Sequence, residues 1–252
     1  MNDNNDVFSI NYKKSLQYWA DIPPTVDGVL GGFGFISNAD IEGSELFLKS
    51  LFSSDNPPST NTALDCGAGI GRITKQLLLP HFDLVDVVEP DEKFINSIKE
   101  YVGQLGSKLG TLHRVGLQEF IPARKYDVIW NQWVLGYLTD EDLEAYLIRC
   151  RDSLSPTGII VVKENVTSSG KIEKDSTDSS VTRTFKQYIR IFKKCSLKRI
   201  KQCKQANFPN GIYPVYMFAL VPNHKELERS LTKTNTVLKN NSCNITQNEM
   251  EL

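Results

Sequence analysis

Short apolar runs alternate with amphipathic stretches along the chain from Asn61 onwards. The spacing of apolar residues has a helical period at residues 71–79, 91–105 and 140–154. The runs between these stretches have the length and composition of buried strands, and they read TALDC, LVDVVE, TLHRV, YDVIWN and GIIVVKEN. Strands that alternate with helices in this way predict a parallel sheet with helices on both faces.

The pattern changes towards the C-terminus. Residues 180–194 predict a further helix, and residues 196–205 and 213–221 predict two strands that complete the sheet as an antiparallel pair. The segment 222–252 is rich in Asn, Thr, Lys and Glu and has few large apolar residues. This composition predicts a mobile tail outside the core.

The segment before the alternation predicts two helices separated by a loop. Residues 9–20 predict a short helix with Ser9 as its cap, and residues 40–52 predict the second helix. The glycine-rich stretch VDGVLGGFGF between them predicts a loop that lies close to a ligand. We therefore divide the chain into an N-terminal helical lid segment, a main domain and a flexible tail, at residues 1–57, 58–222 and 223–252.

Composition indicates a globular protein with one main domain. The 252 residues are 40% hydrophobic and 23% charged, and 29 Lys and Arg balance 30 Asp and Glu. This balance argues against a surface that binds nucleic acid throughout, and the basic stretch 183–204 is interpreted first as a solvated surface. No apolar run approaches the roughly 20 residues of a membrane span. The N-terminus also lacks the pattern of a secretory signal.

Cysteine and histidine positions indicate neither disulfides nor a metal site. The five cysteines are an odd number without C-x-x-C spacing, which favours a reducing compartment. His81, His113 and His224 are scattered without the spacing of metal ligands. We expect no metal.

The most informative local motif is LDCGAGIGR at residues 64–72, between a predicted strand and a predicted helix. Glycines there let backbone amides approach a ligand, although tight turns also use glycine for structural reasons alone. Glu89 ends the next strand, where a carboxylate can accept hydrogen bonds from two ribose hydroxyls. A dinucleotide fingerprint needs glycine at position 72, where this chain has arginine. The motif therefore favours S-adenosylmethionine over NAD, with Arg72 either on the donor's carboxylate or exposed on a helix.

The chain resembles the protein alpha-N-terminal methyltransferases from about Tyr18 to Leu220. The resemblance is carried by the stretches IPPTVDGVLGG, LDCGAGIGRITK, GLQEF, YDVIWNQWVLG, VKEN, DSSV and IYPVYMFAL. It implies the class I methyltransferase fold, a Rossmann-like α/β fold with a seven-stranded sheet. It also implies methylation, by S-adenosylmethionine, of the free α-amine of proteins that begin Xaa-Pro-Lys once methionine is removed, with S-adenosylhomocysteine as product. The resemblance further implies that the protein is located in the nucleus and cytoplasm and that its partners are proteins with such N-termini. We expect it to bind neither membranes nor nucleic acid directly.

The resemblance also implies two sets of binding residues. The donor-binding positions are Trp19, Gly67, Arg72, Glu89, Pro90, Asp91, Leu117, Gln118 and Gln132. The family usually has Asp where this chain has Glu89, and Ile-Thr where it has Pro90 and Asp91. The substrate-binding positions are Leu30, Gly31, Ile36, Trp133, Asp175, Ser180, Ile212 and Tyr213. Each apolar member of these sets, taken alone, is more often a core residue.

Three residues are implied as the catalytic group, and one of them departs from the family. Asn165 is expected to orient the amine and Asp178 to accept its proton. Asp175 is expected to hold the lysine ammonium of the substrate. Tyr137 replaces the family's histidine, and its unperturbed pKa near 10 prevents it from acting as a base at neutral pH. The α-amine, with a pKa of about 7.7–8.0, is partly neutral at pH 7, so it needs little activation.

Two other functions remain open at this point. One is a methyltransferase for small-molecule amines, against which the IPPTVDG and DSSV stretches argue. The other is a protein that binds the donor or a peptide N-terminus with little or no catalysis, which the replacement by Tyr137 makes conceivable.

Overall fold

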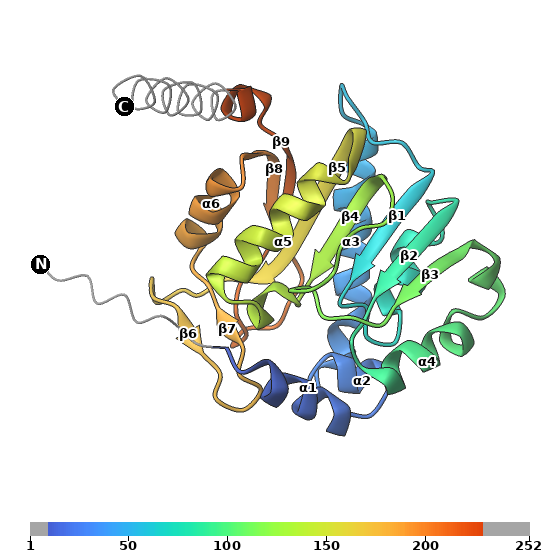
Figure 1. The fold of residues 1–252 in the computed structure, drawn as a ribbon. Coiled ribbons are helices and arrows are strands. Elements are labelled where there is room, and N and C mark those ends of the chain that lie inside the picture. The colour runs from blue at the N-terminus through green and yellow to red at the C-terminus, as the bar shows by residue number, and fades with distance from the viewer. Residues whose placement is uncertain (1–9, 229–252) are drawn as a thin grey trace, which may run out of the picture.

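The computed structural model describes residues 10–228, in which seven strands form one sheet (Figure 1). The strand order is β3-β2-β1-β4-β5-β9-β8. Strands β1 to β5 pair in parallel, and β9 is antiparallel to both of its neighbours. The strands are β1 (Thr62–Cys66), β2 (Leu84–Val88), β3 (Leu109–His113), β4 (Tyr126–Gln132), β5 (Leu154–Asn165), β8 (Leu197–Lys204) and β9 (Val215–Pro222). The predicted parallel sheet and its closing antiparallel pair are confirmed.

Side chains that alternate along each strand build a core on each face of the sheet. In β4, Val128 and Trp130 pack with α3 (Ser37–Phe52), whereas Ile129 between them packs with α5 and α6. The helix α4 (Glu92–Val102) and the π-helical turn Thr74–Leu78 share the α3 face. The opposite face carries α5 (Asp140–Asp152) and α6 (Phe185–Lys194), and Figure 1 shows α5 in front of the sheet and α3 behind it.

The N-terminal segment contains one more helix than predicted. Helix α1 (Tyr12–Asp21) is capped by Asn11, whose side chain accepts from the Lys14 amide, and the predicted cap Ser9 lies outside the described residues. The predicted ligand loop begins with a short helix, α2 (Val26–Val29), and ends in a 3-10 turn at Gly34–Ile36. The side chain of Thr25 caps α2 by accepting from the Gly28 amide, a local signal that a glycine-rich sequence obscures.

The predicted helix 180–194 was wrong in its first residues. Val181–Thr182 form a strand, β7, that pairs with β6 (Glu173–Lys174) in a separate two-stranded sheet. Helix α6 begins only at Phe185, because Thr184 caps it by accepting from the Gln187 amide. The polar stretch around residues 173–182 is therefore a β-hairpin.

The structure describes only the beginning of the predicted C-terminal tail. Residues 224–228 of the predicted tail are helical, and the predicted mobility of residues 229–252 concerns a segment outside the described residues.

Between residues 10 and 228, no helix has both the length and the apolar content to cross a membrane. The basic stretch 183–204 spans α6 and β8, and β8 is an edge strand with exposed Lys198, Arg199 and Lys201. Exposed lysines are a common protection of edge strands against aggregation.

A buried carboxylate, that of Asp40 on α3, joins this helix to the sheet. Asp40 is fully buried and lies 2.7 Å from Arg72 Nη2 and 2.5 Å from Lys163 Nζ. Gln132 Nε2 donates to both of its oxygens at 2.9 Å. Lys163, also fully buried, donates in addition to Ser44 and Gln205. Burial lowers the pKa of Lys163, and the charge of Asp40 opposes that shift.

We expect Asp40→Ala to lower the free energy of unfolding by about 3–5 kcal/mol, because two buried cations would lose their carboxylate. Chemical denaturation monitored by circular dichroism measures this change. The matched control is Glu92→Ala, which removes an ion pair to Arg114 between two side chains that are more than half exposed. The control should cost about 1 kcal/mol or less. Equal losses in the two variants would contradict a stabilising role of the Asp40 network.

Candidate active site

Two adjoining pockets lie at the carboxyl ends of the parallel strands, where open α/β sheets bind ligands. The inner pocket has a cavity volume of about 380 Å³ and lies over the glycine loop that follows β1. The outer pocket, of about 1240 Å³, lies between the β6–β7 hairpin and the segment before β9. They share a wall formed by Trp19, Val29, Leu30, Trp133 and Tyr137.

The glycine loop of the inner pocket requires glycine for two reasons. Gly67 has φ 68°, a conformation that favours glycine, and a Cβ atom there would lie 2.4 Å from Val134 Cγ2. Gly69 also has a positive φ, and its amide donates to Glu89 Oε2 at 2.8 Å. A side chain at either position would thus strain the backbone, and at Gly67 it would also collide with Val134.

Glu89 ties the loop to the next strand end. Its other oxygen, Oε1, accepts from the amide of Asp91 at 2.9 Å. The side chain is 6% exposed, and burial raises the pKa of Glu89 to about 7. Each carboxylate oxygen retains a further lone pair, so Glu89 can still accept from ribose hydroxyls. Asp91 itself caps α4 by accepting from the Phe94 amide.

The opposite wall of the inner pocket is the segment that follows β3. Leu117 and Gln118 line the pocket, and Arg149 of α5 holds this segment by donating to both of their carbonyl oxygens. Leu117 is 4% exposed, so it packs in the core as well as lining the pocket. The carbonyl partners of Arg149 explain why an irregular segment has a fixed position.

All nine predicted donor-binding residues line the inner pocket, namely Trp19, Gly67, Arg72, Glu89, Pro90, Asp91, Leu117, Gln118 and Gln132. Arg72 is 4% exposed and paired with Asp40, so its interpretation as an exposed helix cation is wrong. The structure places Gln132 in the same network, where its Oε1 accepts from Trp130. The sequence did not indicate Asp40 as a site residue. An acidic residue in the first turn of a helix normally indicates only a favourable interaction with the helix dipole.

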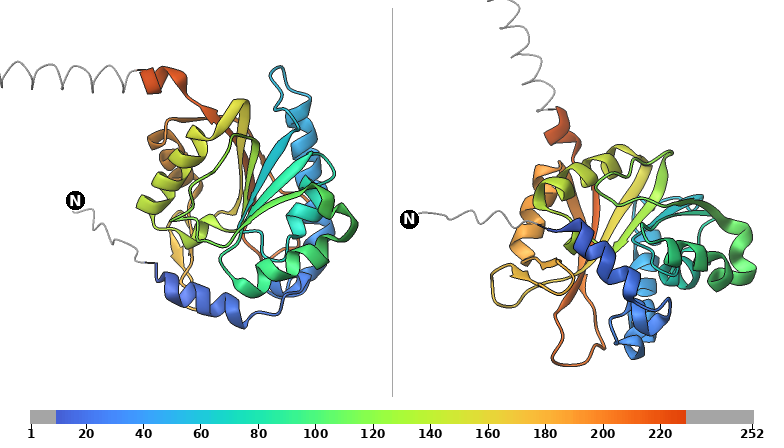
Figure 2. Two further views of the ribbon diagram at one scale, coloured as in Figure 1. Left: turned by 45° about the vertical axis from the view of Figure 1, so that its right-hand side comes forward. Right: turned by 60° about the horizontal axis from the view of Figure 1, so that its bottom comes forward.

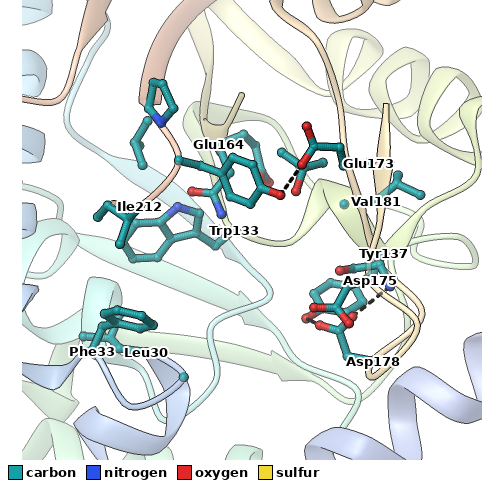
Figure 3. Close-up of a pocket in the computed structure, with 18 of the residues that line it drawn as sticks. Leu30, Phe33, Trp133, Tyr137, Glu164, Glu173, Asp175, Asp178, Val181 and Ile212 are labelled. Carbon is teal, nitrogen blue, oxygen red and sulfur yellow. Dashed lines mark hydrogen bonds between the residues drawn. The ribbon is translucent and has the colours of Figure 1, made fainter. Parts of the chain in front are cut away.

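The outer pocket has an apolar side and an acidic side (Figure 3). Trp133, Ile212, Leu30 and Phe33 lie on the first, and Tyr137, Asp175 and Asp178 lie opposite them. The predicted substrate-binding residues all line this pocket, namely Leu30, Gly31, Ile36, Trp133, Asp175, Ser180, Ile212 and Tyr213. Asn165 lines it from the end of β5.

Trp133 occupies a strained backbone position between the two pockets. Its φ is 53°, which is uncommon for a residue with a large side chain. Glu164, which sequence reasoning did not assign, stabilises the turn that follows, because its Oε1 accepts from the amides of Val134 and Leu135 at 2.8 and 2.7 Å. Burial raises the pKa of Glu164 to about 7. Its position directly before Asn165 at a strand end was the available signal.

Tyr137 and Asp178 form a hydrogen bond at the junction of the pockets. Tyr137 OH donates to Asp178 Oδ2 at 2.6 Å, and the Ser180 amide donates to Oδ1 at 2.9 Å. Burial, reinforced by the charge of Asp178, raises the pKa of Tyr137 well above its usual value. Tyr137 is therefore protonated at neutral pH and orients the carboxylate as a donor.

Helix α1 contributes residues to both pockets. Figure 2 shows this helix crossing the end of the sheet. Near its N-terminus, Ser15 Oγ donates to the carbonyl oxygen of Asp178 at 2.7 Å, and the Asn11 amide donates to Ser179 Oγ at 2.9 Å. At its other end, Lys93 of α4 donates to the carbonyl oxygen of Ala20 at 2.8 Å. The predicted N-terminal helical lid thus contacts the elements of both sites.

Comparison with known proteins identifies what this arrangement resembles. A family model described as AdoMet dependent proline di-methyltransferase matches residues 8–221. The human N-terminal Xaa-Pro-Lys N-methyltransferase 1 is 49% identical over 211 residues, which cover 83% of this chain and 94% of the relative. The alpha N-terminal protein methyltransferase 1 of Drosophila melanogaster is 46% identical over 85% of this chain and 78% of the relative. A solved SAM-dependent methyltransferase of Leishmania major matches with a TM-score of 0.78 and 37% identity, over 83% of this chain and 82% of that one.

We expect the affinity for S-adenosylhomocysteine to rise between about pH 6 and pH 8, because the pKa of Glu89 lies at about 7 and its ionised form accepts more hydrogen bonds. Glu89→Gln should bind at least about tenfold more weakly at pH 8 and show a smaller rise. Calorimetric titration at three pH values measures both effects.

The matched control for this prediction is Glu119→Gln, an exposed carboxylate on the rim of the same pocket. It should retain the wild-type pH dependence. The same rise in the wild type and in Glu89→Gln would show that another group causes it.

Proposed function

Because this chain belongs to the family of AdoMet-dependent proline di-methyltransferases, we propose that it methylates the free α-amino group of proteins that begin Xaa-Pro-Lys after removal of methionine. The chain is an S-adenosylmethionine-dependent methyltransferase with the α/β fold of that class. Relatives named for N-terminal Xaa-Pro-Lys methylation cover most of its length, which supports the proposed substrate.

The outer pocket carries this proposal, since its two sides match the two parts of such an N-terminus. An aromatic and aliphatic wall around Trp133 suits a rigid proline ring, which has no amide hydrogen to satisfy. The acidic side, with Asp175 and Asp178, suits the α-amine and a lysine ammonium. The junction at Tyr137 brings an amine bound there beside the inner pocket.

The residues of the inner pocket fit S-adenosylmethionine. The glycine loop presents only backbone to the pocket at Gly67 and Gly69, and Glu89 retains lone pairs at the strand end where ribose hydroxyls bind. When bound, S-adenosylmethionine supplies a methyl group on a positively charged sulfur. The pocket wall around Trp19, Val29 and Tyr137 would exclude water from the junction.

The protein's own contribution is to orient the amine and to accept its proton. We assign Asn165 to orient the amine and Asp178 Oδ1 or Oδ2 to accept the proton, directly or through water. Tyr137 fixes the carboxylate of Asp178 by its hydrogen bond and is itself no base. Methylation would leave a proton on the amine, and Asp178 would take up this proton and release it to solvent.

We expect a hexapeptide that begins Ser-Pro-Lys to gain mass in steps of one methyl group when incubated with the enzyme and S-adenosylmethionine. The N-acetylated peptide should gain none, because it lacks a free amine. Mass spectrometry gives the target and the number of methyl groups together. Donor binding without any mass gain would favour a binding protein with little catalysis.

We expect the rate of peptide methylation to show no titration near pH 6.5 that is due to position 137, because tyrosine replaces the family's histidine there.

Asp178→Asn should lower kcat by about a hundredfold or more, while the donor still binds. Tyr137→Phe should lower kcat less, since Asp178 keeps the Ser180 amide as partner. Tyr137→His should introduce a titration near 6.5.

The pH profile of kcat in the wild type and the three variants tests this assignment. A wild-type titration near 6.5 that persists in Tyr137→Phe would identify another base. Full activity of Asp178→Asn would exclude Asp178 as the proton acceptor.

A further inference from the structure

Glu173 is an acidic residue of the outer pocket that has no role in the chemistry described above. It lies on β6, two residues before Asp175, and both line the pocket. The ladder of the hairpin continues to Asp175, whose amide donates to the carbonyl oxygen of Ser180 at 2.9 Å. Because side chains alternate along a strand, Glu173 and Asp175 face the same side of the hairpin.

Two hydroxyl groups fix the carboxylate of Glu173 without neutralising it. Ser169 Oγ donates to Oε1 at 2.6 Å, and Tyr213 OH donates to Oε2 at 2.5 Å (Figure 3). These bonds lower the pKa of Glu173, so that the side chain is ionised at neutral pH. A carboxylate has about four lone-pair positions, and two of them are used here. Glu173 can therefore accept from a cation in the pocket.

The side chains on the hairpin side of the pocket favour a basic ligand. Among the described residues that line it, Glu164, Glu173, Asp175 and Asp178 are acidic and Lys174 is basic. Figure 3 shows Glu173 apart from the group formed by Tyr137, Asp175 and Asp178. Its charge thus lies beyond the place assigned to the α-amine and the third residue.

The spacing of the acidic residues matches an extended peptide. Residues two apart on a strand are separated by about 6.6–6.8 Å, and the same spacing separates alternate residues of an extended peptide. With the α-amine at Asp178 and the third residue at Asp175, a peptide that follows the hairpin brings its fourth and fifth residues to Glu173. Arginine and lysine side chains are long enough to reach it from either position.

We propose that Glu173 is a specificity-determining residue, which binds a second basic side chain at the fourth or fifth residue of the substrate. This inference rests on the proposed function and extends it from the first three residues to the next two. Tyr213 positions the carboxylate from the opposite wall, so the subsite is formed across the pocket.

The test compares hexapeptides that begin Ser-Pro-Lys and continue with alanine, with one arginine at the fourth or the fifth residue, or with glutamate at both. For the wild type, kcat/KM should be about two- to fivefold higher for at least one arginine peptide than for the alanine peptide, mainly through KM. The glutamate peptide should be the poorest. The arginine advantage should decrease as salt is raised.

Three variants identify the residue responsible. Glu173→Gln should lose the arginine advantage while still methylating the alanine peptide. Glu173→Lys should reverse the order and favour the glutamate peptide. Glu141→Gln, an exposed carboxylate in the first turn of α5, has the same change of net charge and should behave as the wild type.

The outcomes separate this inference from the proposed function. An arginine advantage that persists in Glu173→Gln, or that is absent from the wild type, would overturn the role of Glu173 alone. Failure of the wild type to methylate even the alanine peptide would overturn the proposed function and this inference with it.

Discussion

The active site depends on the ion pairs and hydrogen bonds that the buried carboxylate of Asp40 forms. This carboxylate holds Arg72 after the glycine loop, Gln132 at the end of β4 and Lys163 near the end of β5. These three residues belong to elements that surround both pockets, and a single side chain of α3 links them. Buried charges are costly unless each is paired, so this network permits little variation in the position of α3. The shape of the inner pocket follows from that constraint.

The second constraint is the contact between the two pockets. Tyr137 lines both, and its hydrogen bond to Asp178 places a carboxylate where an amine would meet a methyl group. The β6–β7 hairpin that carries Asp178 is short, and α1 holds it through Ser15 and Asn11. The residue proposed as proton acceptor is thus positioned by a helix residue that lies 163 positions earlier in the chain.

Much of the fold could be predicted from the sequence because its signals are local. Buried parallel strands such as YDVIWN are short segments rich in aromatic and β-branched residues, and the helix of residues 140–152 begins with a threonine cap and acidic residues. The hairpin of residues 173–182 could not be predicted, since its polar sequence lacks the alternation of a strand. Its structure depends on partners elsewhere, such as Asn11 and Tyr137.

The sequence by itself determined the class of sheet and the glycine loop, because motifs and periodicity are properties of neighbouring positions. The resemblance to a known family implied many of the residues that line the two pockets. The tertiary structure decided which charges meet. Only it paired Arg72 with Asp40, placed Glu164 under the strained turn at Trp133 and brought Tyr213 to Glu173. Such pairs join segments that are distant in sequence, and their energies depend on burial and on distances of a few ångströms. Neither quantity exists until the chain has folded.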